Sequence, residues 1–347
     1  MNVSDYLNDD GLVLMALCSA FALPEGAAAD GTAPFTLSEW NKLARQIHDS
    51  PLKQPVALQG RTAADLAREL TIPTDDAERI VRLLDRSGRL ALELEGLFSC
   101  GLWAVTRADE QYPAKLRDTL KHQAPTVLFG AGSLPLLRCG GIAVIGSRNI
   151  DEAGTAFAQE VGRKAAAARI PVVSGGARGT ARLAMGGELE AGGTAFGVLA
   201  DSLERTVRQP DLRQLLLDGQ LVLLTPYAHT AGFSVGAAMG RNKVIYGLAD
   251  FAVVVSSYFQ TGGTWAGAVE ALKAGWCPVF ARDGANVPKG NQELLKQGAA
   301  ALPEAEFPTI SDLPDWMGKH ANKKTEDTDL FGMALRESPR HRKAGGR

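Results

Sequence analysis

The sequence Gly140-Gly-Ile-Ala-Val-Ile-Gly-Ser-Arg148 is followed, after a helical interval, by Ile170-Pro-Val-Val-Ser-Gly-Gly-Ala-Arg-Gly-Thr180. Each stretch begins as a short apolar segment, ends in a turn of Gly, Ser and Arg, and then continues as a predicted helix. This pattern is typical of a buried parallel strand whose following turn presents backbone N–H groups and the positive end of a helix. We expect the two turns to lie side by side at the carboxyl ends of neighbouring strands, where they would form an anion site.

Apolar segments alternate with helical intervals through the rest of this region, and we expect helices over 152–168 and 180–191. The alternation predicts an α/β fold with an extended, Rossmann-like, doubly wound and mostly parallel sheet. Two shorter strands, over 101–106 and from Pro125 to Phe129, lead into this sheet. The other expected strands are Ile142–Ile145, Pro171–Val173, Thr194–Leu199, Leu221–Leu224, Phe251–Val255 and Pro278–Ala281.

The chain has 347 residues, which exceeds the usual size of one domain and favours two. Residues 1–100 carry helical signals, including a capping box at Thr36–Glu39, and predict a small helical domain. That domain is either a compact DNA-binding fold of the SAM or helix-hairpin-helix kind, or a packing and oligomerisation module. Residues 101–312 form the Rossmann-like domain, and the polar, basic-ended segment 313–347 is expected to be a disordered tail.

Composition excludes several classes of protein. The formal net charge of -2 gives no overall attraction to nucleic acid, so any such site must be a local basic patch. The four cysteines lack paired spacing, which argues against a zinc site and against a disulfide framework. The apolar run Gly11–Leu23 is too short to span a bilayer and follows acidic residues, so we expect a cytoplasmic protein without a membrane partner.

The two glycine turns contain the first candidate ligand-binding residues. Glycine lets a ligand approach the backbone closely, and arginine binds phosphate with two parallel hydrogen bonds. Simple turn geometry is the alternative explanation for the same residues. The candidates are Gly146, Ser147 and Arg148 in the first turn, and Ser174, Gly175, Arg178 and Gly179 in the second.

Two later helix starts have related chemistry. Cations at a helix N-terminus oppose the helix dipole, so a bound anion would explain them, although a solvated first turn is also possible. A Gly-Gly-Thr start supplies free N–H groups and a hydroxyl at the beginning of another helix. The candidates are Arg241, Asn242 and Lys243 at the first helix start, and Gly262, Gly263 and Thr264 at the second.

Evidence for an enzyme is weak. The histidines lie outside the glycine turns, and no Ser-His-Asp order, HExxH or Walker sequence occurs. The first turn is not GxGxxG, so we expect no NAD and no other cofactor. Glu270 is the carboxylate close to the Gly-Gly-Thr motif, where it is either a catalytic base or a solvated helix residue. Trp265 is either a stacking platform for a base or a core residue.

Several motifs resemble, in the same order, the DprA/Smf family of bacterial DNA-processing proteins. The resemblance implies an extended Rossmann fold, binding of single-stranded DNA without a chemical reaction, a homodimer, and loading of a RecA-type recombinase during natural transformation. It also implies that the glycine turns and the Arg-Asn-Lys segment line the DNA groove. The matching motifs are Tyr112-Pro113, Ile142–Arg148, Val173–Gly179, Phe233, Arg241-Asn242-Lys243 and Gly290-Asn291 with Gly298-Ala299.

This sequence departs from the family pattern at named positions. Ala181 stands where the family has Asp, and Lys243 replaces the family's second Arg. The Gly-Gly-Thr stretch is also similar to the related phosphoribohydrolases that release cytokinins, but its Glu comes only at position 270. These departures indicate a divergent branch, with phage defence as a role beside transformation.

Single-stranded DNA binding is therefore the leading hypothesis for function. The alternative is a nucleotide sensor or a phosphoribohydrolase-like enzyme that uses the same phosphate-binding turns. A structural partner protein that assembles through its helical N-terminal region is the third hypothesis.

Overall fold

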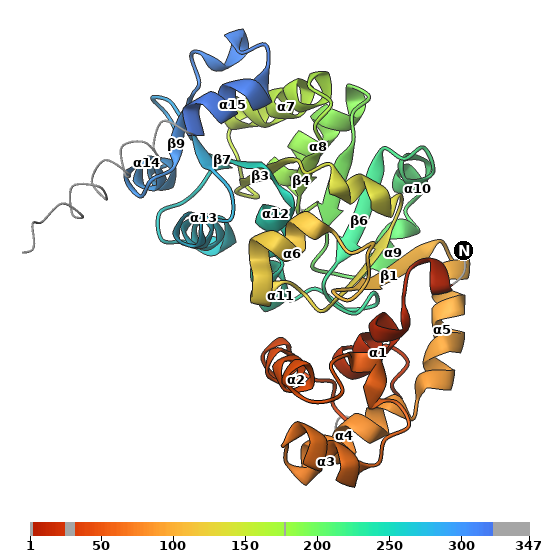
Figure 1. The fold of residues 1–347 in the computed structure, drawn as a ribbon. Coiled ribbons are helices and arrows are strands. Elements are labelled where there is room, and N and C mark those ends of the chain that lie inside the picture. The colour runs from red at the N-terminus through yellow and green to blue at the C-terminus, as the bar shows by residue number, and fades with distance from the viewer. Residues whose placement is uncertain (1–2, 25–31, 177, 322–347) are drawn as a thin grey trace, which may run out of the picture.

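A computed structural model describes residues 3–24, 32–176 and 178–321 of the chain (Figure 1). Its centre is a nine-stranded sheet with the order β1-β2-β6-β5-β4-β3-β7-β8-β9. Strands β3 to β9 run parallel to one another, whereas β1 pairs with β2, and β2 with β6, antiparallel. The strands are β1 (Leu102–Thr106), β2 (Val127–Ala131), β3 (Ile142–Gly146), β4 (Val172–Ser174), β5 (Ala195–Val198), β6 (Leu221–Thr225), β7 (Phe251–Ser256), β8 (Val279–Asp283) and β9 (Ala300–Pro303).

The predicted fold class and the predicted strands are confirmed. In register, Ile142 of β3 lies beside Val172 of β4 and Phe251 of β7. The central strands are buried on both faces, which explains their continuous runs of Val, Ile, Leu and Ala. The sequence analysis missed β9, a short strand with the weak apolar pattern Ala-Ala-Leu-Pro.

Helices cover both faces of the sheet. The crossovers β3–α7–β4 and β4–α8–β5 progress in one direction along the sheet, while β7–α13–β8 and β8–α14–β9 progress in the other. Right-handed crossovers therefore place the two sets of helices on opposite faces. The helices are α6 (Ala114–Leu120), α7 (Glu152–Ala167), α8 (Thr180–Glu190), α9 (Leu203–Val207), α10 (Pro210–Leu217), α11 (Val235–Gly240), α12 (Asn242–Leu248), α13 (Gly262–Ala274) and α14 (Lys289–Lys296).

The expectation of a disordered tail from residue 313 is wrong for its first part. Helix α15 (Leu313–Ala321) packs beside α7, and its Leu313 and Met317 side chains are buried (Figure 1). These two residues are four apart, so they share one face of the helix and add to the core of the sheet. Residues 322–347, where the rest of the tail was expected, lie outside the described residues.

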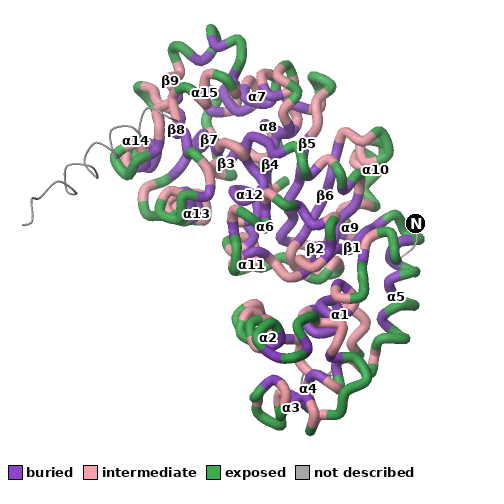
Figure 2. Tube along the Cα trace, viewed as in Figure 1, coloured by how far each residue is buried: buried purple, intermediate pink, exposed green. Residues whose placement is uncertain are grey.

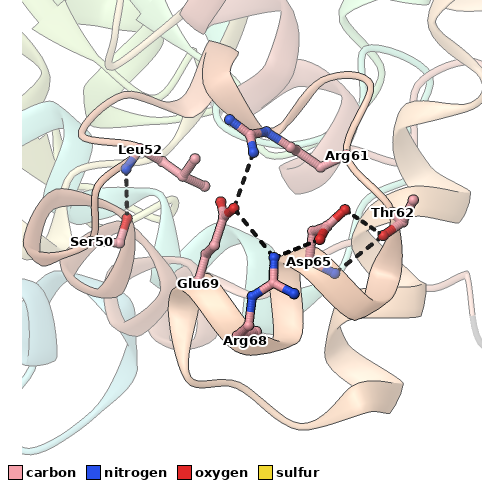
Figure 3. Close-up of polar contacts among 7 residues, drawn as sticks. All are labelled: Ser50, Leu52, Arg61, Thr62, Asp65, Arg68 and Glu69. Atoms are coloured by element: carbon pink, nitrogen blue, oxygen red, sulfur yellow. Dashed lines mark hydrogen bonds and ion pairs between the residues drawn. The ribbon is translucent and has the colours of Figure 1, made fainter.

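The N-terminal helices form a lobe with its own hydrophobic core (Figures 1 and 2). The predicted capping box at Thr36 and Glu39 is confirmed. At the start of the third helix, Thr62 accepts a hydrogen bond from the Asp65 N–H, and the Asp65 carboxylate pairs with Arg68 at 2.7 Å (Figure 3). The helices are α1 (Asp9–Cys18), α2 (Leu37–Asp49), α3 (Ala63–Leu70), α4 (Thr74–Leu84) and α5 (Ser87–Ser99).

Buried Asp109 attaches this lobe to the sheet. Its carboxylate accepts hydrogen bonds from the Asn8 N–H, before α1, and from the N–H and hydroxyl of Thr106, at the end of β1. Arg107 and Asn41 of α2 are also hydrogen-bonded, at 2.8 Å. The lobe is therefore held to β1 by directional polar contacts as well as by apolar packing. None of the helices in the described ranges is both long enough and apolar enough to cross a bilayer.

Glu188 on α8 generates a prediction about stability and pH. Its side chain is buried; one carboxyl oxygen accepts the Thr194 N–H and the other has no hydrogen-bond partner within the described structure. Burial raises the pKa of Glu188 from an ordinary value of 4.5 to about 8. Because the folded-state pKa lies above the unfolded one, the stabilisation is complete below pH 4.5 and is lost as pH rises through 8.

We therefore expect Glu188→Gln, which stays neutral at every pH, to remove this loss. Between pH 5 and pH 9 the native chain should lose on the order of a few kcal/mol of unfolding free energy relative to the variant. Urea unfolding at several pH values measures the difference. Parallel pH profiles for the two proteins would show that Glu188 ionises in the folded state as easily as in the unfolded chain.

Candidate nucleic-acid interface

The candidate site lies where the order of the sheet reverses, between β3 and β7. Crossovers leave these neighbouring strands in opposite directions, and this opens a crevice at their carboxyl ends. Gly146, Ser174 and Ser256, the last residues of β3, β4 and β7, all line a cavity of about 450 Å³ there. The two glycine turns are thus side by side, as their spacing predicted.

Most of the candidate residues meet in this cavity, which we call the switch-point cavity. Segments distant in sequence reach it from the ends of three strands and from the starts of α12 and α13. Gly179 and Lys243 are the two candidates that do not line it. The candidates that line it are Gly146, Ser147, Arg148, Ser174, Gly175, Arg178, Arg241, Asn242, Gly262, Gly263 and Thr264.

The charge of the switch-point cavity is positive. Arg148 and Arg178 are exposed at its walls, and Arg241 is buried, with 7% of its surface exposed. The described residues that line the cavity include no Asp or Glu. Ala181, which stands where the resemblance places an Asp, is one of the lining residues, so that position adds no negative charge.

Arg241 is the buried cation of the site. One guanidinium nitrogen lies 3.5 Å from the Gly175 carbonyl oxygen, and its Nε has no hydrogen-bond partner in the described structure. Burial lowers the pKa of Arg241 to about 10, so it remains protonated at neutral pH. The charge of Asp201 opposes this shift, and the charge of Arg148 adds to it. A buried charge without a carboxylate partner is costly, and a bound anion would reduce that cost.

Two helices begin at the cavity without a side-chain cap. Neither α8, which follows Gly179, nor α13, which follows Thr261, has a capping hydrogen bond from the side chain of its first flanking residue. The Thr180 N–H of α8 donates to the Ser147 carbonyl oxygen, and the other first N–H groups of the two helices are available to an anion. Helix α7 differs, because Asp151 accepts a hydrogen bond from the Gly154 N–H and caps it. The helix starts that could bind an anion at this cavity are therefore those of α8 and α13, and not that of α7.

Some candidate side chains form hydrogen bonds within the protein and so stabilise the site. The Ser174 hydroxyl is buried and donates to the Val144 carbonyl at 2.6 Å. The Asn242 amide donates to the Gly263 carbonyl at 3.1 Å and so holds the start of α13. Lys243 is half-buried on α12, outside the lining residues.

Gly179 also acts through the backbone. Its φ of +90° suits glycine, and a Cβ at this position would lie 2.5 Å from the Arg148 carbonyl oxygen. The Thr180 hydroxyl donates to the Ser147 carbonyl at 3.0 Å across the same contact. Gly179 therefore allows the two turns to touch, which brings Arg148 and Arg178 to one cavity.

Buried Asn291 fixes the end of β7. Its amide oxygen accepts the Ser257 N–H at 2.8 Å, and its NH₂ group lies 3.1 to 3.2 Å from the carbonyl oxygens of Val254, Val255 and Arg282. The family resemblance included this residue, and the structure gives it a positioning role.

The sequence analysis did not predict an exposed apolar rim around the cavity, although Phe233 was among the matching family motifs. Phe233 is 51% exposed, and the Arg148 guanidinium carbon lies 5.4 Å from its ring centre. Tyr258 lies two residues after the end of β7. Its place after a predicted strand could have been recognised, because the residues after two other strands were already candidates. The rim residues are Phe233, Val235, Met239 and Tyr258.

The two residues left open beside the Gly-Gly-Thr motif lie outside the cavity. Glu270 is exposed on α13, and it is not among the lining residues. Trp265 is half-buried with its ring edge-on to Phe259 at 5.0 Å, which favours packing. Glu270 is therefore not placed to act as a catalytic base at the cavity, and Trp265 is not placed to stack a base there.

Residues 103–311 match the family model described as DNA recombination-mediator protein A. DNA processing protein A from Streptococcus pneumoniae has a similar structure, with a TM-score of 0.59 and 22% identity, covering 77% of this chain and 95% of that one. The corresponding protein from Helicobacter pylori, described as having a unique single-stranded DNA binding mode, gives a TM-score of 0.50 and 21% identity, covering 65% and 96%. No curated protein sequence matches the chain. At these identities the two structures show a shared fold, while the family model spans more than half of the chain, which therefore belongs to the DNA recombination-mediator protein A family.

Proposed function

We propose that the chain binds single-stranded DNA through the switch-point cavity and acts as a DNA recombination mediator. The observation that carries this proposal is the buried Arg241, which has no carboxylate within ion-pair distance in the described structure and lies beside two further arginines. A phosphodiester supplies the missing negative charge, and its oxygens suit arginine and free helix N–H groups.

The rim favours a single strand over a duplex. Phe233 and Tyr258 are exposed aromatic side chains next to the arginines, and unpaired bases can stack on such rings. A duplex keeps its bases stacked inside and would contact only the charged groups. Because phosphate contacts carry no direct sequence information, we expect little sequence preference.

The finer parts of the proposal are supported by the family alone. They are a homodimer, a RecA-type recombinase as partner, a cytoplasmic location, and a role in natural transformation or in phage defence. The described residues add no contact that identifies a partner protein.

A free nucleotide is the second candidate ligand. A cavity of about 450 Å³ is within the usual range for small-molecule sites, and it presents phosphate-binding groups. The hydrolytic form of this hypothesis needs a carboxylate, and Glu270 lies outside the cavity. We therefore favour a nucleotide only as a bound ligand and not as a substrate. Binding whose affinity does not increase with strand length would indicate this second candidate.

Replacing both exposed arginines, Arg148→Ala with Arg178→Ala, should leave the fold intact and weaken binding of an oligothymidylate by roughly tenfold to a hundredfold near physiological salt. The salt dependence of log K should also become shallower by about 1.4, because two phosphate contacts with a single strand are lost. Fluorescence anisotropy at several salt concentrations, with single-stranded, duplex and mononucleotide ligands, measures both effects.

Arg138→Ala is the matched control, because this exposed arginine precedes β3 at the opposite edge of the sheet. It should bind like the native chain. Native affinity and salt slope in the double variant would place the DNA elsewhere on the molecule.

Ser174→Ala tests whether the Ser174 hydroxyl stabilises the fold or contacts the DNA. Loss of the buried hydrogen bond to Val144 should lower the unfolding free energy by about 1 kcal/mol while the DNA affinity of the folded protein stays unchanged. Exposed Ser133→Ala, which removes no capping hydrogen bond, should change neither quantity. A Ser174→Ala variant with native stability and lost affinity would instead make that hydroxyl a DNA ligand.

A further inference from the structure

A second group of cations lies at the same edge of the sheet as the switch-point cavity. Strand β1 runs antiparallel to β2, and β2 runs antiparallel to β6, so β1 points in the same direction as β6 and its parallel neighbours. The end of β1 and the start of β2 therefore lie at the carboxyl edge of the sheet, as the cavity does. Figure 1 shows the N-terminal lobe at the β1 end of the sheet.

Asn41 on α2 connects the lobe to this part of the edge. Its amide oxygen accepts a hydrogen bond at 2.8 Å from the guanidinium of Arg107, which directly follows β1. Its NH₂ group donates to the His122 carbonyl oxygen at 2.8 Å, shortly before β2. Arg45 lies four residues after Asn41, on the same face of α2 and one turn further along. Together with Lys121, which precedes His122, Arg45 and Arg107 form a group that we call the junction cations.

The junction cations are not neutralised by the protein. In the parts of the chain that the structure describes, none of the three has a carboxylate within ion-pair distance. Arg107 is half-buried, and burial lowers its pKa. The carboxylate of nearby Asp109 is buried and already accepts hydrogen bonds from the lobe and from β1. Because Arg45 and Lys121 are exposed, their charges are accessible to a ligand.

The backbone of Lys121 is strained. Its φ of 52° and ψ of -120° form a combination that glycine adopts readily and that a side chain disfavours. Glycine would suit the turn between α6 and β2 better, so the fold gives no reason for a lysine here. Strain of this kind is concentrated at functional sites, which indicates that the exposed ammonium group binds a ligand.

We propose that the junction cations form a second phosphate-binding site for the single strand that the switch-point cavity binds. This inference rests on the proposed function and extends the path of the DNA along the carboxyl edge toward the lobe. The shared edge favours a polyanion that reaches both sites over an acidic peptide that would fit only one of them.

The distance between the two sites suits a strand of moderate length. Four strand spacings of about 4.8 Å separate β2 from β3, which is about 19 Å. A stacked strand advances about 3.4 Å per nucleotide, so about six further nucleotides would cover that distance. Asp201, which follows β5 on this edge, lies 3.6 Å from the Arg205 guanidinium, and this pairing reduces its repulsion of the strand.

Lys121→Gly combined with Arg45→Ala removes two of the junction cations. Glycine relieves the strain at position 121, and Arg45 is exposed, so this junction variant should unfold at the same temperature as the native chain or at a higher one. Arg138→Ala combined with Arg169→Gly is the matched control. Both of these arginines are exposed, Arg169 also has a positive φ of 56°, and they precede β3 and β4 at the opposite edge of the sheet.

The test compares oligothymidylates of about 5 and about 15 nucleotides by fluorescence anisotropy at several salt concentrations. The native chain and the control should bind the long strand more tightly than the short one. In the junction variant, affinity for the long strand should fall roughly tenfold near physiological salt, and the salt dependence of log K should become shallower by about 1.4, because two phosphate contacts are lost. Its affinity for the short strand should stay native, because the switch-point cavity is unchanged.

The outcomes separate this inference from the proposed function. Native affinity and salt slope of the junction variant for the long strand would overturn the second site and leave binding at the switch-point cavity intact. An equal loss for both lengths would also overturn it, because the cations would then act on the cavity itself. A loss seen only with a duplex would assign them to another ligand and so overturn it too. If the native chain bound neither strand, the proposed function itself would fail.

Discussion

The contact between the two glycine turns is the constraint on which the rest of the site depends. Gly179 lies against the Arg148 backbone so closely that a side chain would not fit, and Thr180 donates a hydrogen bond to Ser147 across the contact. The Ser147 N–H in turn donates to the Ser256 carbonyl at the end of β7. Three strand ends are thus joined by short backbone contacts, and their side chains share one cavity.

This arrangement has an electrostatic cost in the absence of a ligand. Arg241 is buried near Arg148, with no carboxylate within ion-pair distance in the described structure, and burial lowers its pKa. The stability that the apolar core gives to the sheet must offset the repulsion between these like charges. A local loss of stability of this kind is expected at functional sites, where a bound ligand of opposite charge reduces the repulsion.

The candidate anion site lies at different helix starts from those used in a dinucleotide-binding protein. In that class the helix after the first strand supplies its free N-terminus to a pyrophosphate. Here Asp151 caps α7, which follows β3, while α8 and α13 begin uncapped at the cavity. The free N–H groups therefore come from two helices on opposite sides of the switch point, and an extended polyanion can contact both.

The sequence by itself determined the sheet, because strongly apolar strands ending in glycine turns and alternating with helices have few other solutions. It also predicted that Arg148 and Arg178 lie side by side, since parallel strands bring their carboxyl ends together. Arg241 and Lys243 were predicted from a helix start, and of these two Arg241 lines the cavity. Only the tertiary structure showed that the Ser174 and Asn242 side chains donate hydrogen bonds to backbone carbonyls. The sequence cannot show whether a hydroxyl or an amide faces a ligand or a carbonyl. The burial of Arg241 and the exposed rim at Phe233 also required the structure, since each depends on contacts between segments distant in the chain.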